Sequence, residues 1–193
     1  MALQRGVAYF GDHIAACHTV YGDKMFVDTR DMSLAPHILL DGMWERRLSD
    51  FYVRSLYDGF HVVDVGSNFG WYAVIAGRAV GRAGKLWAFE ANPQVADILK
   101  RNILINGLID RTDVTVAPVY SSVQDMTFTL FEKHMGSSSL GEVTEAYANT
   151  YFDSLREITL RSVTLDNVIP AGTRVDLIRV DAEGAEPHVL MGA

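Results

Sequence analysis

The stretch from residue 61 to residue 90 most constrains what this chain can fold into. His61–Val65 is a short β-branched run, and from Phe69 onward the apolar residues recur at helical spacing. A turn punctuated by glycines follows, and Lys85–Glu90 is then apolar enough for a second buried strand. A strand, a helix and a strand in this order predict one β-α-β unit of a parallel sheet.

Two glycines follow the first of these strands, and an acid ends the second. Gly66 and Gly70 lack a Cβ, so the backbone can turn sharply and approach a ligand over the helix N-terminus. Glu90, some 20 residues beyond Gly70, is in position to accept hydrogen bonds from both ribose hydroxyls of a nucleoside. Together with Asp64 on the first strand, these residues predict a nucleoside site. A β-α-β crossover without any ligand is the alternative.

The spacing of the glycines separates two classes of ligand. A dinucleotide fingerprint has the pattern Gly-x-Gly-x-x-Gly, whose middle glycine admits a pyrophosphate. Asn68 stands at that middle position, two residues after Gly66, and would crowd a pyrophosphate. The chain also has no Tyr-x-x-x-Lys motif for hydride transfer. A nicotinamide-dependent oxidoreductase is therefore disfavoured.

Composition and charge limit the partners. A length of 193 residues fits one domain, and 49% hydrophobic with 21% charged residues is typical of a soluble globular protein. The net charge of -7 argues against binding to nucleic acid or to an anionic membrane surface. Polar residues interrupt the apolar N-terminal stretch and no run is long enough for a membrane span, so we expect a cytoplasmic protein.

The single cysteine excludes an internal disulfide. Cys17 lies beside His18, with His13 nearby, which leaves open a metal ligand or a nucleophile. A lone cysteine is more often a small buried hydrophobe, and no second pair of ligands has metal spacing. We therefore assign no metal site.

The segments before the β-α-β unit are shorter. Residues 1–40 read as short strands and turns packed on the core, and residues 41–58 carry the apolar spacing of an amphipathic helix. This helix is expected to cover an edge of the sheet. The alternative is that Trp44 or Glu45 contributes to a pocket.

Beyond Glu90 the strands and helices continue to alternate. Asn92 and Pro93 predict the start of a helix that ends near residue 106, and residues 113–119 predict a third strand. This alternation implies a doubly wound, mostly parallel sheet, with extra antiparallel strands around residues 126–165. The serine-rich turn at 136–139 reads as an exposed linker, or as a loop that touches substrate.

A further core strand over residues 175–181 ends on an acid. Ligands of open α/β sheets bind outside the carboxyl ends of the strands, so Asp181 and Glu183 should face the same crevice as Gly66 and Glu90. With Glu186, these acids are crowded unless they are solvated, paired or used. One can be a general base and another a ligand for a cation or a cofactor amine. Alternatively, Asp181 only caps the following turn.

These motifs together resemble a known family. The run Asp64-x-Gly66-x-Asn68-x-Gly70 resembles the first motif of class I S-adenosylmethionine-dependent methyltransferases. With residues 88–93 and 176–186, the chain resembles the FkbM family, whose members methylate hydroxyls of polyketides or sugars, including glycans. The resemblance implies a Rossmann-like α/β fold and S-adenosylmethionine as cofactor. It implies these cofactor-binding residues: Asp64, Gly66, Ser67, Asn68, Gly70, Glu90 and Ala91. It implies Asp181 and Glu183 as catalytic acids.

The chain departs from the family pattern in two places. Ala91 stands where a proline is common, and the chain ends at Ala193, before strands that a complete class I domain would add. We therefore expect residues 41–193 to form an incomplete methyltransferase domain with its C-terminal strands missing. The leading hypothesis is an O-methyltransferase for a small-molecule or glycan hydroxyl. The alternative is a non-catalytic nucleoside-binding module of the same fold.

Overall fold

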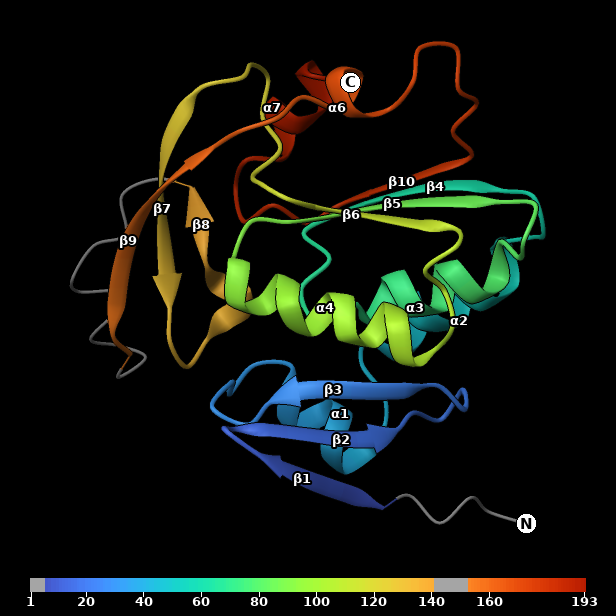
Figure 1. The fold of residues 1–193 in the computed structure, drawn as a ribbon, viewed down its shortest axis with the longest axis vertical. Helices are drawn as coiled ribbons and strands as arrows, with labels where there is room; N and C mark the ends of the chain where they lie inside the picture. The colour runs from blue at the N-terminus through green and yellow to red at the C-terminus, as the bar shows by residue number, and fades with distance from the viewer. Residues whose placement is uncertain (1–5, 141–152) are drawn as a thin grey trace.

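A four-stranded sheet lies at the centre of the molecule (Figure 1). The structure is a computed structural model and describes residues 6–140 and 153–193. All three strand pairs in this sheet are parallel. In spatial order the strands are β10 (Leu177–Val180), β4 (His61–Val65), β5 (Lys85–Glu90) and β6 (Thr112–Val116). The predicted β-α-β unit is confirmed, and the third strand is shorter than predicted.

Helices cover both faces of this sheet (Figure 1). On one face lie α2 (Arg46–Ser55), α3 (Trp71–Ala79) and α4 (Pro93–Ile105), and on the other lie α6 (Leu165–Val168) and α7 (Glu186–Met191). Successive side chains of a strand point to opposite faces, so Val62 belongs to one apolar core and Val63 to the other. The prediction of a doubly wound α/β sheet is confirmed.

The N-terminal segment forms its own small antiparallel sheet. It consists of β1 (Val7–Gly11), β2 (Ile14–His18) and β3 (Lys24–Asp28), followed by α1 (Ala35–Asp41). The Asn102 side chain of α4 binds this sheet, because it accepts from the backbone N–H of Phe26 at 2.6 Å and donates to the Phe26 carbonyl at 2.9 Å. Cys17 is buried in the core, and its Sγ donates to the Ile38 carbonyl.

The helix predicted over residues 41–58 is shorter than expected. Gly42, at φ 64°, ends α1 in the left-handed region, and α2 begins only at Arg46. The preceding helix α1 was not predicted, because Pro36 suggested a break. Proline stands here in the first turn of α1, where its missing N–H costs no hydrogen bond.

A third sheet is antiparallel and stands beside the helices. It pairs β7 (Asp125–Phe131) with β8 (Ser139–Leu140) and β9 (Leu155–Arg161), and the short 3-10 turn η1 (Met135–Ser137) lies between β7 and β8. This confirms the prediction of extra antiparallel strands. The loop predicted between them lies partly outside the described residues. In the part of the chain that is described, no helix is long and apolar enough to cross a membrane.

Candidate active site

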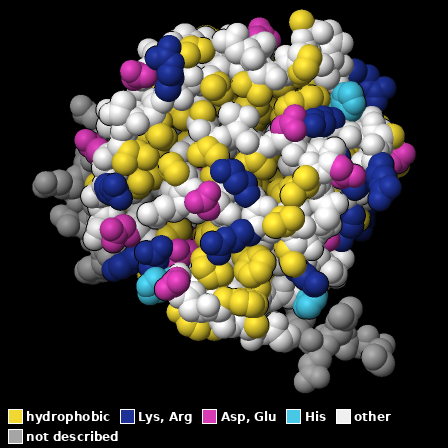
Figure 2. All heavy atoms as spheres, in the orientation of Figure 1, with side chains coloured by type: hydrophobic (Ala, Val, Ile, Leu, Met, Phe, Trp, Pro, Cys, Tyr) yellow, Lys and Arg dark blue, Asp and Glu magenta, His cyan; other side chains and the backbone are white. Residues whose placement is uncertain are grey.

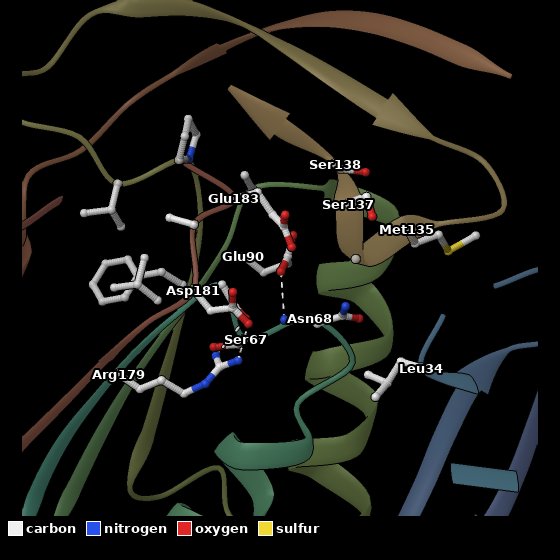
Figure 3. Close-up of a pocket in the computed structure, with 18 of the residues that line it drawn as sticks. Leu34, Ser67, Asn68, Glu90, Met135, Ser137, Ser138, Arg179, Asp181 and Glu183 are labelled. Carbon is white, nitrogen blue, oxygen red and sulfur yellow. Dashed lines mark hydrogen bonds and ion pairs between the residues drawn. The ribbon is translucent and has the colours of Figure 1, made fainter. Parts of the chain in front are cut away.

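A pocket opens at the carboxyl ends of β4, β5 and β10 (Figure 3). The β4–α3 loop and the end of β5 form one side, and the segment after β10 forms another. Seven of the nine residues predicted for the site line this pocket: Gly66, Ser67, Asn68, Glu90, Ala91, Asp181 and Glu183. Asp64 and Gly70 are not among the residues that line it.

Glu90 is the buried acid at the tip of β5. Its Oε2 accepts the backbone N–H of Asn68 and its Oε1 accepts that of Asn92, each at 2.8 Å. The carboxylate therefore holds the β4–α3 loop against β5 while it faces the pocket. Burial raises the pKa of Glu90 to about 7, although these backbone donors act in the opposite direction.

This raised pKa predicts a pH dependence of stability. A carboxyl whose pKa rises from 4.5 unfolded to about 7 folded contributes stability that is fully present below pH 4.5. The contribution is lost as the pH rises to about 7. We expect the free energy of unfolding of the ligand-free protein to fall across this interval, by up to about 3 kcal/mol. Urea denaturation at several pH values measures it, and Glu90→Gln should remove this component. An equal pH dependence in the variant would contradict the prediction.

The two loop glycines are required by contacts within the protein. A Cβ added at Gly66 would overlap the backbone carbonyl of Asp181, and one added at Gly70 would lie 2.6 Å from Cδ1 of Leu99 on α4. Both glycines also have positive φ, 77° and 92°. We expected the missing Cβ of Gly66 to make room for a ligand, but at that position the space is filled by the backbone that follows β10.

Arg179 is a site residue that the sequence analysis did not identify. Its Nη1 donates to Asp64 Oδ1 at 2.9 Å and to the Gly66 carbonyl at 3.1 Å, and its Nη2 donates to Asp181 Oδ2 at 2.6 Å. The guanidinium also lies over the ring of Tyr72, at 4.5 Å from the centroid. Asp64 thus contributes to the site only through Arg179, as its fully buried counter-ion. A basic residue inside an otherwise apolar strand was the available signal.

The three acids after β10 have different surroundings. Asp181 is paired with Arg179. The pKa of Glu186 is lowered first by its own backbone N–H and then by the N–H groups of Gly184 and Ala182, which its carboxylate accepts in the turn before α7. No hydrogen-bond or ion-pair partner for the carboxylate of Glu183 is found among the described residues. Partial desolvation raises the pKa of Glu183, and the charges of Asp181 and Glu186 add to this effect. Glu183 is therefore the acid best suited to accept a proton.

The opposite wall comes from two distant segments. Leu34 and Trp44 come from the N-terminal part, and residues 135–138 come from η1 and the residue after it. Asp31 joins these segments, because its Oδ2 accepts the N–H of Leu34 at 2.7 Å and its Oδ1 accepts that of Met135 at 3.1 Å.

The sequence analysis left open whether Trp44 or Glu45 contributes to a pocket, and whether the serine-rich turn lies near substrate. Trp44 lines the pocket, whereas Glu45 lies outside it and accepts the Tyr72 hydroxyl at 2.6 Å. The serine-rich turn also reaches the pocket, through Ser137 and Ser138. Within residues 6–140 and 153–193, no three His, Cys, Asp or Glu side chains are grouped so that they could hold a metal ion.

Comparison with known proteins identifies the family. The model of the methyltransferase FkbM domain matches residues 64–193, which is most of the chain. The chain belongs to the FkbM methyltransferase family. Methyltransferase sdnD of Sordaria araneosa is 29% identical over 156 residues, which cover 68% of this chain and 59% of that protein. The FkbM chain described here thus spans under two thirds of the length of that relative.

Further matches are partial. A probable cobalt-precorrin-6B C(15)-methyltransferase of Sulfurisphaera tokodaii is 40% identical over 48 residues, 25% of each chain. The crystal structure of P. horikoshii TYW2 in complex with MeSAdo is 19% identical, with a TM-score of 0.45 over 58% of this chain and 41% of that one. A SAM-dependent O-methyltransferase from Thermotoga maritima is 26% identical, with a TM-score of 0.37 over 52% of this chain and 39% of that one.

The cofactor of this FkbM domain is S-adenosylmethionine, and the residues of the pocket fit it. Glu90 offers a buried carboxylate for the ribose hydroxyls, beside the apolar Phe89 and Val119. Asn68 stands where a dinucleotide fingerprint has the glycine that admits a pyrophosphate, a group that this cofactor lacks. Ala91 lines the pocket next to Glu90, so the absent proline removes no polar contact.

Proposed function

We propose that this FkbM domain transfers a methyl group to a hydroxyl of a sugar, a glycan or a polyketide-like small molecule. The observation that carries the proposal is the position of Glu183. Glu183 lines the same pocket as Glu90 and Met135. Its carboxylate has no hydrogen-bond or ion-pair partner among the described residues. A base at this point is available to an acceptor that enters beside the cofactor.

Each residue of the pocket has a role in this proposal. Glu90 binds the ribose and keeps the β4–α3 loop in place. When bound, the cofactor supplies an electrophilic methyl group. Transfer would place this methyl group on the acceptor oxygen and would leave the electron pair of the carbon–sulfur bond on sulfur. Glu183 takes the proton that the hydroxyl loses, and the walls contribute by holding the two reactants in line.

The charges in and around the pocket favour a neutral acceptor. Three acids line the pocket, Glu90, Asp181 and Glu183, against the single guanidinium of Arg179 in its described lining. On the face drawn in Figure 2, acidic and basic side chains are interspersed with apolar ones and do not form one basic patch. With a net charge of -7 for the chain, these observations argue against a polyanion such as nucleic acid as the acceptor.

The proposal is tested by isotope transfer from methyl-labelled S-adenosylmethionine. The acceptors are a hydroxylated macrolactone and a panel of methyl glycosides, each compared with its O-methylated form, in which the reactive hydroxyl is blocked. Label in a product stable to mild alkali indicates a methyl ether, because methyl esters hydrolyse. Binding of S-adenosylhomocysteine without transfer to any acceptor would favour the non-catalytic module.

Glu90→Ala is expected to weaken the binding of S-adenosylhomocysteine by roughly 1.5 to 3 kcal/mol, the range for hydrogen bonds to a charged group. The substitution removes the carboxylate that faces the pocket. Titration calorimetry measures the change, and Glu157→Ala on the exposed part of β9 is the control. An unchanged dissociation constant in Glu90→Ala would show that Glu90 does not bind the ribose.

A further inference from the structure

We propose that the Arg179–Asp181 ion pair binds the amino-acid end of the cofactor, with Arg179 on its carboxylate and Asp181 on its ammonium group. This inference rests on the cofactor site proposed above and assigns the part of that site that Glu90 does not reach. A nucleoside cofactor with a methionyl chain carries three charged groups, and the ribose contact accounts for none of them.

Arg179 is suited to bind a carboxylate. It is the one cation among the described residues that line the pocket, and its side chain is 14% exposed. A guanidinium has five N–H groups, and the contacts to Asp64, Gly66 and Asp181 use three of them. Two N–H groups therefore remain for a ligand.

The guanidinium is also held firmly before any ligand arrives. Asp64 and the Gly66 carbonyl bind one of its ends, and the ring of Tyr72 supports its plane. A fixed arginine loses little side-chain freedom when it binds a planar carboxylate, whereas a lysine would present only a flexible point charge.

Asp181 provides the opposite charge beside it. Its side chain is 57% exposed, and the bond from Arg179 occupies only Oδ2. An amino acid carries an ammonium and a carboxylate on the same carbon, so a neighbouring acid and guanidinium 2.6 Å apart match both groups at once. Around Arg179, the carboxylates of Asp64 and Asp181 leave one excess negative charge, which suits a cofactor with a sulfonium.

The spacing along the loop agrees with this arrangement. Figure 3 shows Arg179 beside Ser67 and Glu90 beside Asn68, so the two groups lie at successive points of the same loop. Asp181 and Glu90 both line the pocket. A ligand whose ribose contacts Glu90 would thus extend its methionyl chain along the loop toward Asp181.

Three adenosine ligands test the proposal by calorimetry. S-adenosylhomocysteine has both amino-acid groups, its decarboxylated analogue has only the amine, and 5′-methylthioadenosine has neither. In the unchanged protein, we expect the decarboxylated analogue to bind roughly 10- to 100-fold more weakly than S-adenosylhomocysteine. Equal affinities of these two ligands would overturn the role of Arg179, whatever its variants do.

Variants then locate the effect. Arg179→Met should weaken the binding of S-adenosylhomocysteine roughly 10- to 100-fold. The dissociation constant of 5′-methylthioadenosine should change by no more than about twofold. The double change Asp64→Asn with Arg179→Met avoids an unpaired buried carboxylate and should give the same pattern. Asp181→Asn should weaken both ligands that carry an amine. Arg174→Met is the control, because Arg174 is exposed and pairs with Asp176 before β10 begins.

Two outcomes separate this inference from the proposed function. If Arg179→Met weakens 5′-methylthioadenosine as much as S-adenosylhomocysteine, Arg179 only supports the loop and the inference is wrong, while the cofactor site stands. If the unchanged protein binds none of the three ligands, the proposed function fails, and the inference fails with it.

Discussion

Glu183→Gln is expected to lower the rate of methyl transfer by roughly two to four orders of magnitude, with the affinity for S-adenosylhomocysteine unchanged. The amide keeps the size of the side chain but cannot take the acceptor proton. In the unchanged protein the rate should fall as the pH drops below the raised pKa of Glu183. This acidic limb should be absent in the variant.

The control for this prediction is Glu157→Gln, an exposed acid on β9 outside the lining of the pocket. Asp181→Asn tests the other acid, which should show its main effect on cofactor affinity. If, at saturating cofactor, Glu183→Gln keeps the normal rate and Asp181→Asn loses it, the base is Asp181. Normal rates in both variants would reject acid–base catalysis from this segment.

Gly66→Val is expected to cost more than about 4 kcal/mol of stability and to abolish cofactor binding, an effect in the upper tail for single substitutions. Two penalties combine at this residue. A β-branched side chain is strained at φ 77°, and its Cβ would overlap the Asp181 carbonyl, which is backbone and cannot rotate away. Urea denaturation and calorimetry with S-adenosylhomocysteine measure both effects.

Gly172→Val separates the two penalties. Gly172 has φ 78°, almost the same as Gly66, but a Cβ added there would meet nothing within 4 Å. This variant should therefore show only the cost of the strained backbone. If both substitutions destabilise the protein equally, the approach of the Asp181 backbone contributes nothing.

The parts of the fold that the sequence predicted are those decided by local contacts. The β-α-β unit was predicted because its two strands are apolar runs and glycines punctuate the turns between its elements. Its helix α3 is apolar and buried on nearly all sides. The β7 and β9 strands were predicted because their residues alternate. The helix α1 was not, because a proline in the first turn of a helix and a proline that breaks one look alike in a sequence.

The sequence predicted most residues of the site, but it did not predict which of them contact one another. Glu90 follows its strand directly, so its place at the pocket could be read from the chain. The partners of Arg179 could not, because Asp64 lies 115 residues away in sequence and meets it only when β10 pairs with β4. For the same reason, the sequence did not show that the Asp181 carbonyl occupies the space beside Gly66.

The hydrogen bonds of Asp31 also bear on the order in which the protein folds. Its carboxylate joins Leu34 to Met135, which is 104 residues from Asp31 along the chain. Contacts across so long a loop cost more closure entropy than those within the β-α-β unit, and they form more slowly. The side of the pocket made by the β4–α3 loop can therefore assemble early in folding. We therefore expect the wall that carries Trp44 and Met135 to be completed late, after the N-terminal sheet and the β7–β8 turn have both docked.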